Sequence, residues 1–296
     1  CWTNALATTC CGVWNWSCKT LSAKTNTCAC VAVRALVVTM PTYHGLMGDV
    51  AGIVRACHRR GVRVMVDEAH GPHLPLGTDS YLSESLAQAV QASLYDAHHP
   101  SVIAPTVCYA LTHFASEFAG TVSLSAESAL AQLRGILVAF HRAGFERICL
   151  VNSHLEPAHI AGIRQVVSEL RTEYGPFVAF PDQTEKRWAR TLSAEYKSGS
   201  CHAGRYETSL LALARPDLCR DSIAHELPAN PSDFLAQVRA GATTFKQAGG
   251  PQAYFGQPAA ANASEGTELL ALLTTMVLTT IAETWGLPLP PLSPPR

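Results

Sequence analysis

The sequence predicts a three-layer α/β/α sandwich built on a mostly parallel sheet. From residue 31 onward, candidate strands and candidate helices alternate along the chain. The candidate strands are continuous apolar runs such as "VRVMV" at 62–66, which is typical of strands buried on both faces. The alternation of these strands with amphipathic helices is the pattern of an α/β domain, and the 296 residues suffice for a large core.

Each element follows from its local pattern. Short runs rich in Val, Ile and Leu predict strands at 31–38, 62–66, 101–105, 146–152 and 176–180. Apolar residues spaced by three and four predict helices at 48–60, 84–94, 128–144, 158–174, 184–196, 206–214 and 265–285. We expect residues 34–38 to pair in parallel beside residues 62–66, because a strand–helix–strand unit crosses over right-handedly.

Composition divides the chain into four parts. Residues 1–30 hold six of the eleven cysteines and three of the five tryptophans, with no helical or alternating pattern. This part is expected to be poorly ordered, although a disulfide or metal cluster is the alternative. Residues 31–66 form a strand–helix–strand piece, 67–286 the main domain, and 287–296 a proline-rich tail.

Charge and hydropathy exclude several functions. The net charge of −1 argues against a nucleic-acid partner. "MVLTTIA" near the C-terminus is too short to span a membrane and indicates a buried helix face. The cysteines after residue 30 are scattered, which is typical of reduced cysteines and predicts a cytoplasmic protein.

Two acid–imidazole pairs point to a metal site. "DEAHGPHLPLGTD" follows the strand at 62–66 and places Glu68 two residues before His70, with Asp79 at its end. His154 and Glu156 repeat this spacing after the strand at 146–152. Residues two apart in an extended segment point to the same side, so both pairs can converge. Three carboxylates and two imidazoles exceed what a structural zinc needs and suit two divalent ions bridged by a carboxylate.

These motifs resemble the creatininase (creatinine amidohydrolase) family. "EAHGPHLPLGTD" is similar to that family's E-x-H-G-P-H-L-P-L-x-T-D block, and "FAGTVSLS", "GFERICLVNSHLEP" and "HAGRYETSLLALA" follow in the family's order over about residues 68–285. The resemblance implies a metal-dependent hydrolase of a non-peptide C–N bond, most often in a small cyclic amide. It also implies a homo-oligomer, usually a hexamer; some family members act on peptides instead.

The resemblance also implies site residues. One metal ion would be held by Glu68, Asp79 and His154, and the other by His70, Asp79 and Glu156, with Zn, Mn or Fe as the two divalent metals. His202 matches the family's active-site histidine, with Glu207 five residues further on. His202, Glu156 and Glu207 are therefore the expected catalytic residues.

The substrate pocket departs from that of creatininase proper. Leu155 stands where that enzyme has an aromatic residue, and Ser198 with Gly199 stands near its Trp-Asp pair. Together with His202, these residues are expected to touch the substrate, a small-molecule amide other than creatinine. Residues 245–261 carry loop glycines and an aromatic pair, and are expected to help close the site or to form a subunit contact.

Residues 33–71 show a second resemblance. They are similar to the core of fold-type I pyridoxal-phosphate enzymes near the Orn/Lys/Arg decarboxylases, with Asp67 matching the aspartate that binds the pyridine nitrogen. The lysines downstream, Lys186, Lys197 and Lys246, lack the Ser-x-His-Lys setting that would supply a Schiff base. The alternative to an active hydrolase is therefore a fusion product with little or no activity, in which the decarboxylase-like piece replaces the missing first strand.

Overall fold

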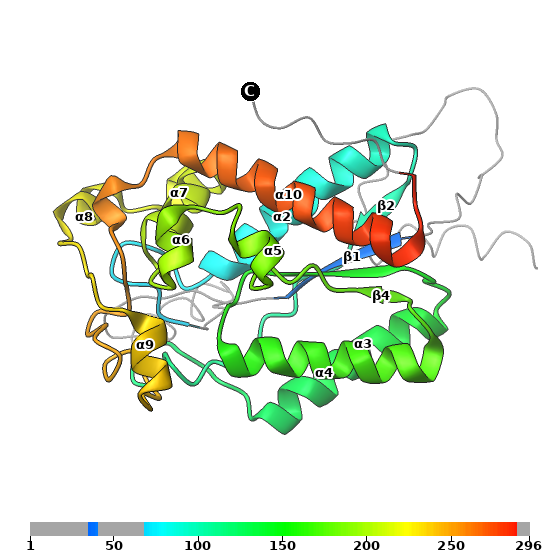
Figure 1. Cartoon of the computed structure of the whole chain (residues 1–296), viewed down its shortest axis with the longest axis horizontal. Helices are drawn as coiled ribbons and strands as arrows, with labels where there is room; N and C mark the ends of the chain where they lie inside the picture. Colours follow the sequence, from blue (N-terminus) through cyan, green and yellow to red (C-terminus); the bar gives the residue numbers. More distant parts are fainter. Residues whose placement is uncertain (1–34, 41–67, 289–296) are drawn as a thin grey trace, which may run out of the picture. The chain divides into compact units, whose positions relative to one another are not determined.

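A four-stranded parallel sheet lies at the centre of the computed structural model, which describes residues 35–40 and 68–288 (Figure 1). All of these lie within residues 33–296, one of two units into which the chain divides. The predicted segment 1–30, the helix at 48–60, the strand at 62–66, Asp67 and residues 289–296 lie outside the described residues. The strand order is β2-β1-β3-β4, with bounds β1 Ala35–Met40, β2 Ser101–Ile103, β3 Ile148–Asn152 and β4 Val178–Ala179.

One of the two inner positions of the sheet is taken by β1. Leu36 lies opposite Val102 of β2 on one side and opposite Ile148 of β3 on the other, and both pairings are parallel. The predicted partner of this strand, residues 62–66, lies outside the described residues. A strand from the 31–66 piece nevertheless belongs to the sheet, as expected.

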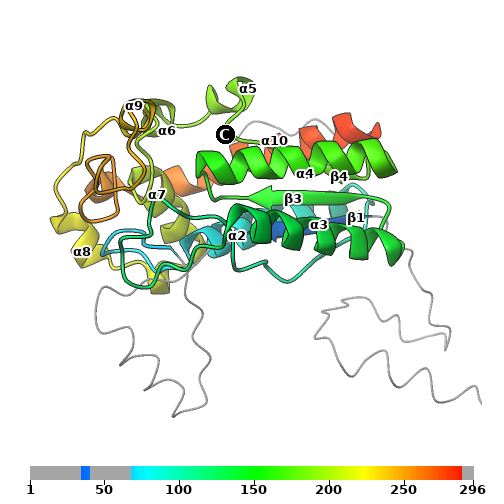
Figure 2. The same ribbon diagram turned by 90° about the horizontal axis from the view of Figure 1, so that it is seen from below.

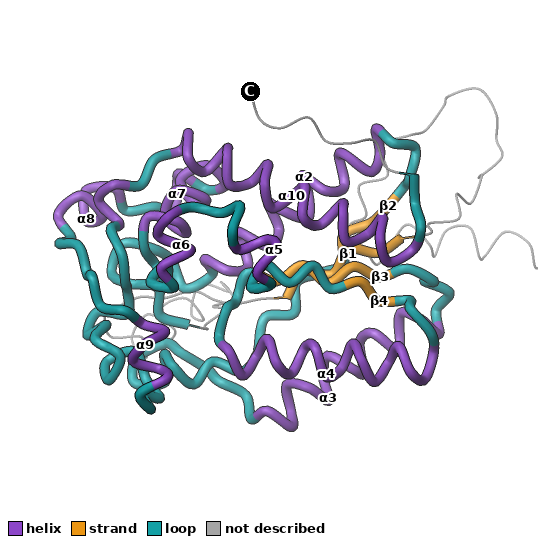
Figure 3. Tube along the Cα trace, in the orientation of Figure 1, coloured by secondary structure: helices purple, strands orange, loops and turns teal. Residues whose placement is uncertain are grey.

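Alternating side chains of β3 bind two helical layers to the sheet. Ile148 and Leu150 pack with α3 (Ala126–Arg142) and α4 (Pro157–Tyr174) in one core cluster. Cys149 and Val151 belong to a second cluster with α2 (Thr78–Asp96) and α10 (Ala263–Trp285). Figure 3 shows the strands between these two layers, and Figure 2 shows α3 and α4 lying along β3. The three-layer α/β/α prediction is confirmed.

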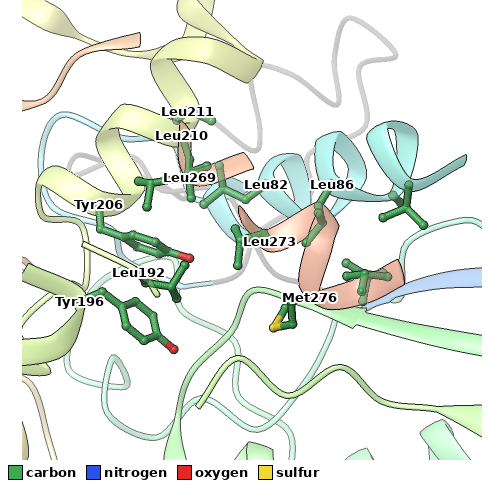
Figure 4. Packing of buried hydrophobic residues seen from close by; sticks show 14 of the residues in the cluster. Leu82, Leu86, Leu192, Tyr196, Tyr206, Leu210, Leu211, Leu269, Leu273 and Met276 are labelled. Carbon is green, nitrogen blue, oxygen red and sulfur yellow. The ribbon is translucent and has the colours of Figure 1, made fainter. Parts of the chain in front are cut away.

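The larger core cluster joins α2, α7 (Arg205–Ala214) and α10 (Figure 4). Leu82 and Leu86 of α2 meet Leu211 of α7 and Leu273 of α10 there. By length and composition alone, α10 could cross a bilayer. Its residues Met276 to Leu278 are buried among α2 and α7, which is the buried face that the sequence predicts.

The predicted helix at 184–196 is broken into α5 (Lys186–Ala189) and α6 (Ala194–Ser198). Leu192 turns into the core between them, and the Ser193 hydroxyl accepts a hydrogen bond from the Tyr196 N–H. That is an N-cap, so a new helix starts there. Further short elements escaped prediction because they are too short to show a period: α8 Asp221–Glu226, α9 Phe234–Arg239, and the 3-10 turns η1 Pro216–Leu218 and η2 Pro258–Ala260.

Candidate metal centre

Seven ionisable side chains converge beyond the end of β3. Most of them come from segment ends: Asp79 lies in the first turn of α2, Glu207 in the first turn of α7, and His154 two residues after β3. A helix N-terminus favours a carboxylate, which suits an acid in the first turn of each of these helices. All seven except His202 are buried: Glu68, His70, Asp79, His154, Glu156 and Glu207.

The first group of potential ligands contains Glu68, Asp79 and His154. His154 Nδ1 lies 2.9 Å from Glu68 Oε2 and 3.3 Å from Asp79 Oδ2. This is the first ligand set that the family resemblance implies, and the structure brings all three side chains together.

The second group contains His70, His202 and Glu207. His70 Nε2 lies 3.4 Å from Asp79 Oδ1 and 3.7 Å from Glu207 Oε2. His202 Nδ1 lies 4.0 Å from the same Glu207 oxygen. One oxygen of Asp79 thus faces each group, which is the bridging position predicted for it.

Backbone carbonyls orient all three histidines. His154 Nε2 donates to Leu111 O over 2.9 Å, and His202 Nε2 donates to Ala69 O over 3.0 Å. His70 donates its Nδ1–H to Glu68 O over 3.3 Å. A carbonyl oxygen can only accept a hydrogen bond, so the other nitrogen of each neutral imidazole ring carries no hydrogen. In each ring, that other nitrogen is directed at carboxylates. Histidines that bind metal ions are held in this way.

Hydrogen bonds from loops fix two of the carboxylates. The buried Thr112 hydroxyl donates to Glu68 Oε2 over 2.5 Å. The N–H of Ala203 donates to Glu207 Oε2 over 2.6 Å, and Ala203 holds a left-handed φ of 48°. Such a conformation is unfavourable for a residue other than glycine, and it is found where function requires it.

Glu156 does not join the second group as predicted. Its carboxylate accepts hydrogen bonds from the N–H groups of His113 and Phe114, over 3.1 and 3.2 Å. β3 ends at Asn152, and Glu156 is the residue that precedes α4. Glu207 lies beside His70, 3.7 Å from its Nε2, whereas neither ligand group of the described residues contains Glu156.

One cavity opens on these groups. Glu156, His202 and Leu155 line it together with four of the potential ligand residues: Glu68, Asp79, His154 and Glu207. Ser198 and Gly199 do not line it: they end α6, where the Ser198 hydroxyl donates to Glu195 O. A Cβ on Gly199 would lie 2.3 Å from Leu235 Cδ1, so this glycine serves the turn. Phe114 and Phe234 in the lining, and Thr112 bonded to Glu68, were not predicted. Phe114 and Thr112 are single loop residues and Phe234 begins the short helix α9, so none of them shows a periodic signal.

Burial and neighbouring charges perturb the acids and imidazoles in opposite directions. Burial opposes the charged form of Glu68, but the nearby His154 lowers the pKa of Glu68 to about 2. Burial opposes protonation of His70, yet Asp79 raises the pKa of His70 to about 9. Burial raises the pKa of Glu207 to about 8 and that of Glu156 to about 7. Without metal, protons therefore balance the negative charge that divalent ions would otherwise balance.

The residues present fit divalent metal ions. Within each group the potential ligand atoms lie within 4.8 Å of one another. Imidazole nitrogens and carboxylate oxygens suit zinc and manganese. His70 Nε2 is buried and makes no hydrogen bond in the described part of the chain, although it points at two carboxylates. A bound cation would satisfy it.

Sequence comparisons agree with this geometry. The creatininase family model, described as creatinine amidohydrolase, matches residues 66–281. The chain is 29% identical over 212 residues to a mycofactocin precursor peptide peptidase of Mycobacterium ulcerans, covering 69% of this chain and 76% of that protein. A 41-residue stretch, 14% of this chain and 8% of the relative, is 49% identical to an arginine decarboxylase of Halalkalibacterium halodurans. The decarboxylase likeness is therefore confined to a fragment.

Solved structures share the fold. A putative creatinine amidohydrolase from Bacteroides fragilis superposes with a TM-score of 0.61 at 18% identity, covering 84% of this chain and 90% of that one. A mutant creatininase of the Zn-Zn type gives 0.59 at 17% identity over 84% of this chain and 90% of its own. A manganese form gives 0.59 at 18% identity, over 84% and 91%. Creatininase-fold proteins are thus known with both metals.

Proposed function

The chain belongs to the creatininase family of hydrolases, and on that premise we propose that it cleaves an amide C–N bond at a centre of two divalent metal ions. The observation that carries the proposal is the position of Asp79, with one carboxylate oxygen facing His154 and the other facing His70. A single buried acid shared by two ligand groups is what a pair of ions a few ångströms apart requires.

The ligand residues would hold these ions in two sets. Glu68, Asp79 and His154 would hold one ion, and His70, Asp79 and Glu207 the other. When bound, divalent ions polarise a carbonyl and lower the pKa of water. The protein's own part is to keep the imidazoles correctly turned and the carboxylates in place.

Two residues at the cavity are placed for proton transfer. Glu156 is held by two backbone N–H groups and faces the cavity, where its carboxylate can take a proton from water. His202 is the least buried of the three histidines and stacks on Phe245 in the lining of the same cavity. We assign His202 to the leaving nitrogen, as the family resemblance implies.

Two substrate classes follow from different observations. The family name and the small cavity favour a small cyclic amide, as the sequence predicts. The curated relative at 29% identity is a peptide peptidase, which favours an amide bond within a peptide. Both require the same bond cleavage at the same metal centre, so the substrate must be decided by assay.

The test is reconstitution with defined metals. Purified protein is stripped with a chelator, reloaded with zinc or manganese, and assayed against creatinine, other cyclic amides and a set of short peptides. Turnover that disappears on stripping and returns on reloading supports the proposal, and the better substrate class identifies the amide. A metal-loaded protein without turnover on either class contradicts the proposal and favours an inactive fusion product.

A further inference from the structure

An aromatic wall stands beside the candidate metal centre. We define it as Phe114, Phe234 and Phe245, which line the cavity together with Glu68, Asp79, His154 and Glu207. Phe114 and Phe234 are partly exposed, whereas Phe245 is buried. Two ring surfaces are therefore presented to whatever enters the cavity.

The rings form one connected stack with the catalytic histidine. His202 stacks on Phe245 at a centroid distance of 4.2 Å. Phe245 lies 5.7 Å from Phe234, and Phe234 meets Phe114 edge-on at 5.2 Å. Buried Phe255 supports the wall from behind, 5.1 Å from Phe234. These distances are those at which aromatic pairs attract each other, so the wall is a packed surface.

Backbone hydrogen bonds tie the wall to the reacting groups. The Phe245 N–H donates to Phe114 O over 2.8 Å, and the Phe114 N–H donates to Glu156. The Phe255 N–H donates to His202 O over 2.8 Å. Phe114 and Phe245 are thus tied to the segment that holds Glu156, and Phe255 to His202, which suits a surface that positions substrate.

The charge of the cavity restricts what the wall can contact. No lysine or arginine lines this cavity among residues 68–288, and its other charged groups are acids and histidines of the centre. A substrate carboxylate at the wall would have no lysine or arginine to pair with, whereas a substrate ring could pack against the faces and edges of the phenylalanine rings.

We infer that this site takes amides whose leaving amine carries an uncharged aromatic or large apolar group. The inference rests on the proposed function, because His202 marks the leaving-nitrogen side and the wall continues directly from His202 through Phe245. The wall selects this group by ring contact, and residue Leu155 adds apolar surface to the same cavity.

Binding of simple amides tests the inference without relying on turnover. N-benzylacetamide carries a ring on the amine side, N-methylacetamide carries a methyl group there, and phenylacetamide carries its ring on the acyl side. Titration of zinc-loaded protein by calorimetry gives the affinity of each. We expect N-benzylacetamide to bind at least about tenfold more tightly than either of the others, since burying a ring against aromatic neighbours is worth a factor of that order.

Variants of the wall make the test specific. Phe234→Ala and, independently, Phe114→Ala should each lower the benzyl-to-methyl affinity ratio by about tenfold. The matched control is Phe140→Ala. Phe140 is a partly buried residue of α3 that packs against the core cluster of α3 and α4, so its removal should leave the benzyl-to-methyl affinity ratio as in the parent protein. Circular dichroism confirms that each variant is folded.

The outcomes separate the two proposals. Equal affinity for the three amides, or a ratio that Phe234→Ala and Phe114→Ala leave unchanged, overturns the aromatic wall while metal-dependent turnover can still stand. Tighter binding of phenylacetamide than of N-benzylacetamide overturns the assignment to the amine side. Selective benzyl binding without any metal-dependent hydrolysis contradicts the proposed function alone.

Discussion

Asp79 shows how one residue can organise a whole centre. Its two oxygens lie 3.4 Å from His70 Nε2 and 3.3 Å from His154 Nδ1, and the side chain is buried. A buried carboxylate without a positively charged partner would destabilise the fold. Either the two protonated imidazoles or bound metal cations must therefore stay close to Asp79. The first turn of α2 supplies additional stabilisation of this carboxylate.

His202 provides the first prediction at this scale. His202→Ala should keep bound metal, because Glu68, Asp79, His154, His70 and Glu207 remain, but it should lose about 10²–10⁴ in turnover through loss of proton transfer. Metal analysis by plasma mass spectrometry beside the amide assay measures both quantities. If metal is lost together with activity, His202 is a ligand and its role as proton donor is excluded.

Thr112 provides a second prediction. Its hydroxyl donates to Glu68 Oε2 over 2.5 Å in a buried environment, so it orients a metal ligand. Thr112→Val removes the donor at nearly constant shape and should weaken zinc binding about 10- to 100-fold. Thr112→Ser keeps the hydroxyl and serves as the matched control. Competition with a zinc chelator gives the affinities, and equal affinity of the two variants would show that the hydrogen bond is unimportant.

The site could be predicted from sequence only in part. The first ligand group follows from the "EAHGPHLPLGTD" block and His154, and the structure brings its members together. The place of Glu207 beside His70 could not be deduced from spacing, because it depends on how the loop before α7 turns at Ala203. Glu156 was predicted to bind the second ion; its carboxylate accepts hydrogen bonds from two backbone N–H groups, and neither ligand group of the described residues contains it.

At the scale of elements, the side chains of β3 point alternately to the two faces of the sheet and so pack against both helical layers. Leu133 of α3 faces Ile148 and Leu150 and is almost completely buried, whereas its neighbour Gln132 is exposed. The long helices were predictable because this burial leaves a three- and four-residue period. The short helix α9, with no buried residue, leaves no such period.

Leu133 therefore carries a stability prediction. Leu133→Ala should lower the free energy of unfolding by about 2–5 kcal/mol, through lost burial and the cavity left behind. Gln132→Ala, one position away on the exposed face, should change it by less than about 0.5 kcal/mol. Urea denaturation followed by circular dichroism measures both. Similar losses in the two variants would mean that α3 does not present this face to the sheet.

At the scale of the whole molecule, one of the two inner strands comes from outside the family match. β1 spans Ala35–Met40, whereas the family match begins at residue 66. β1 nevertheless pairs on both sides with strands inside the matched region. The sequence predicted that the decarboxylase-like piece would supply a strand to this sheet, but it could not predict the pairing, because several apolar runs of that piece suit a central position equally well.

Global stability should depend on pH through His73. This histidine is buried, its Nε2 bonds the Thr208 hydroxyl over 2.9 Å, and burial lowers its pKa to about 3. The unfolded chain binds a proton near pH 6.5 and the folded chain does not, so the stabilisation present above pH 6.5 is lost as the pH falls toward 3.

The variant His73→Gln isolates this contribution. Relative to His73→Gln, metal-free parent protein should lose about 2 kcal/mol of unfolding free energy between pH 7 and pH 5. Denaturation curves of both proteins at the two pH values provide the difference, in which the other titrating groups cancel. Parallel pH dependence of parent and variant would show that His73 takes up a proton without unfolding.

The metal content of the purified, dialysed protein tests the central claim most directly. After loading with zinc, plasma mass spectrometry should find about two ions per chain, and Asp79→Asn should lose both because each ligand group shares that carboxylate. Gln132→Ala is the control and should hold as much zinc as the parent. A parent protein that retains no zinc, or an Asp79→Asn variant that retains the full amount, would contradict a centre in which Asp79 bridges two ions.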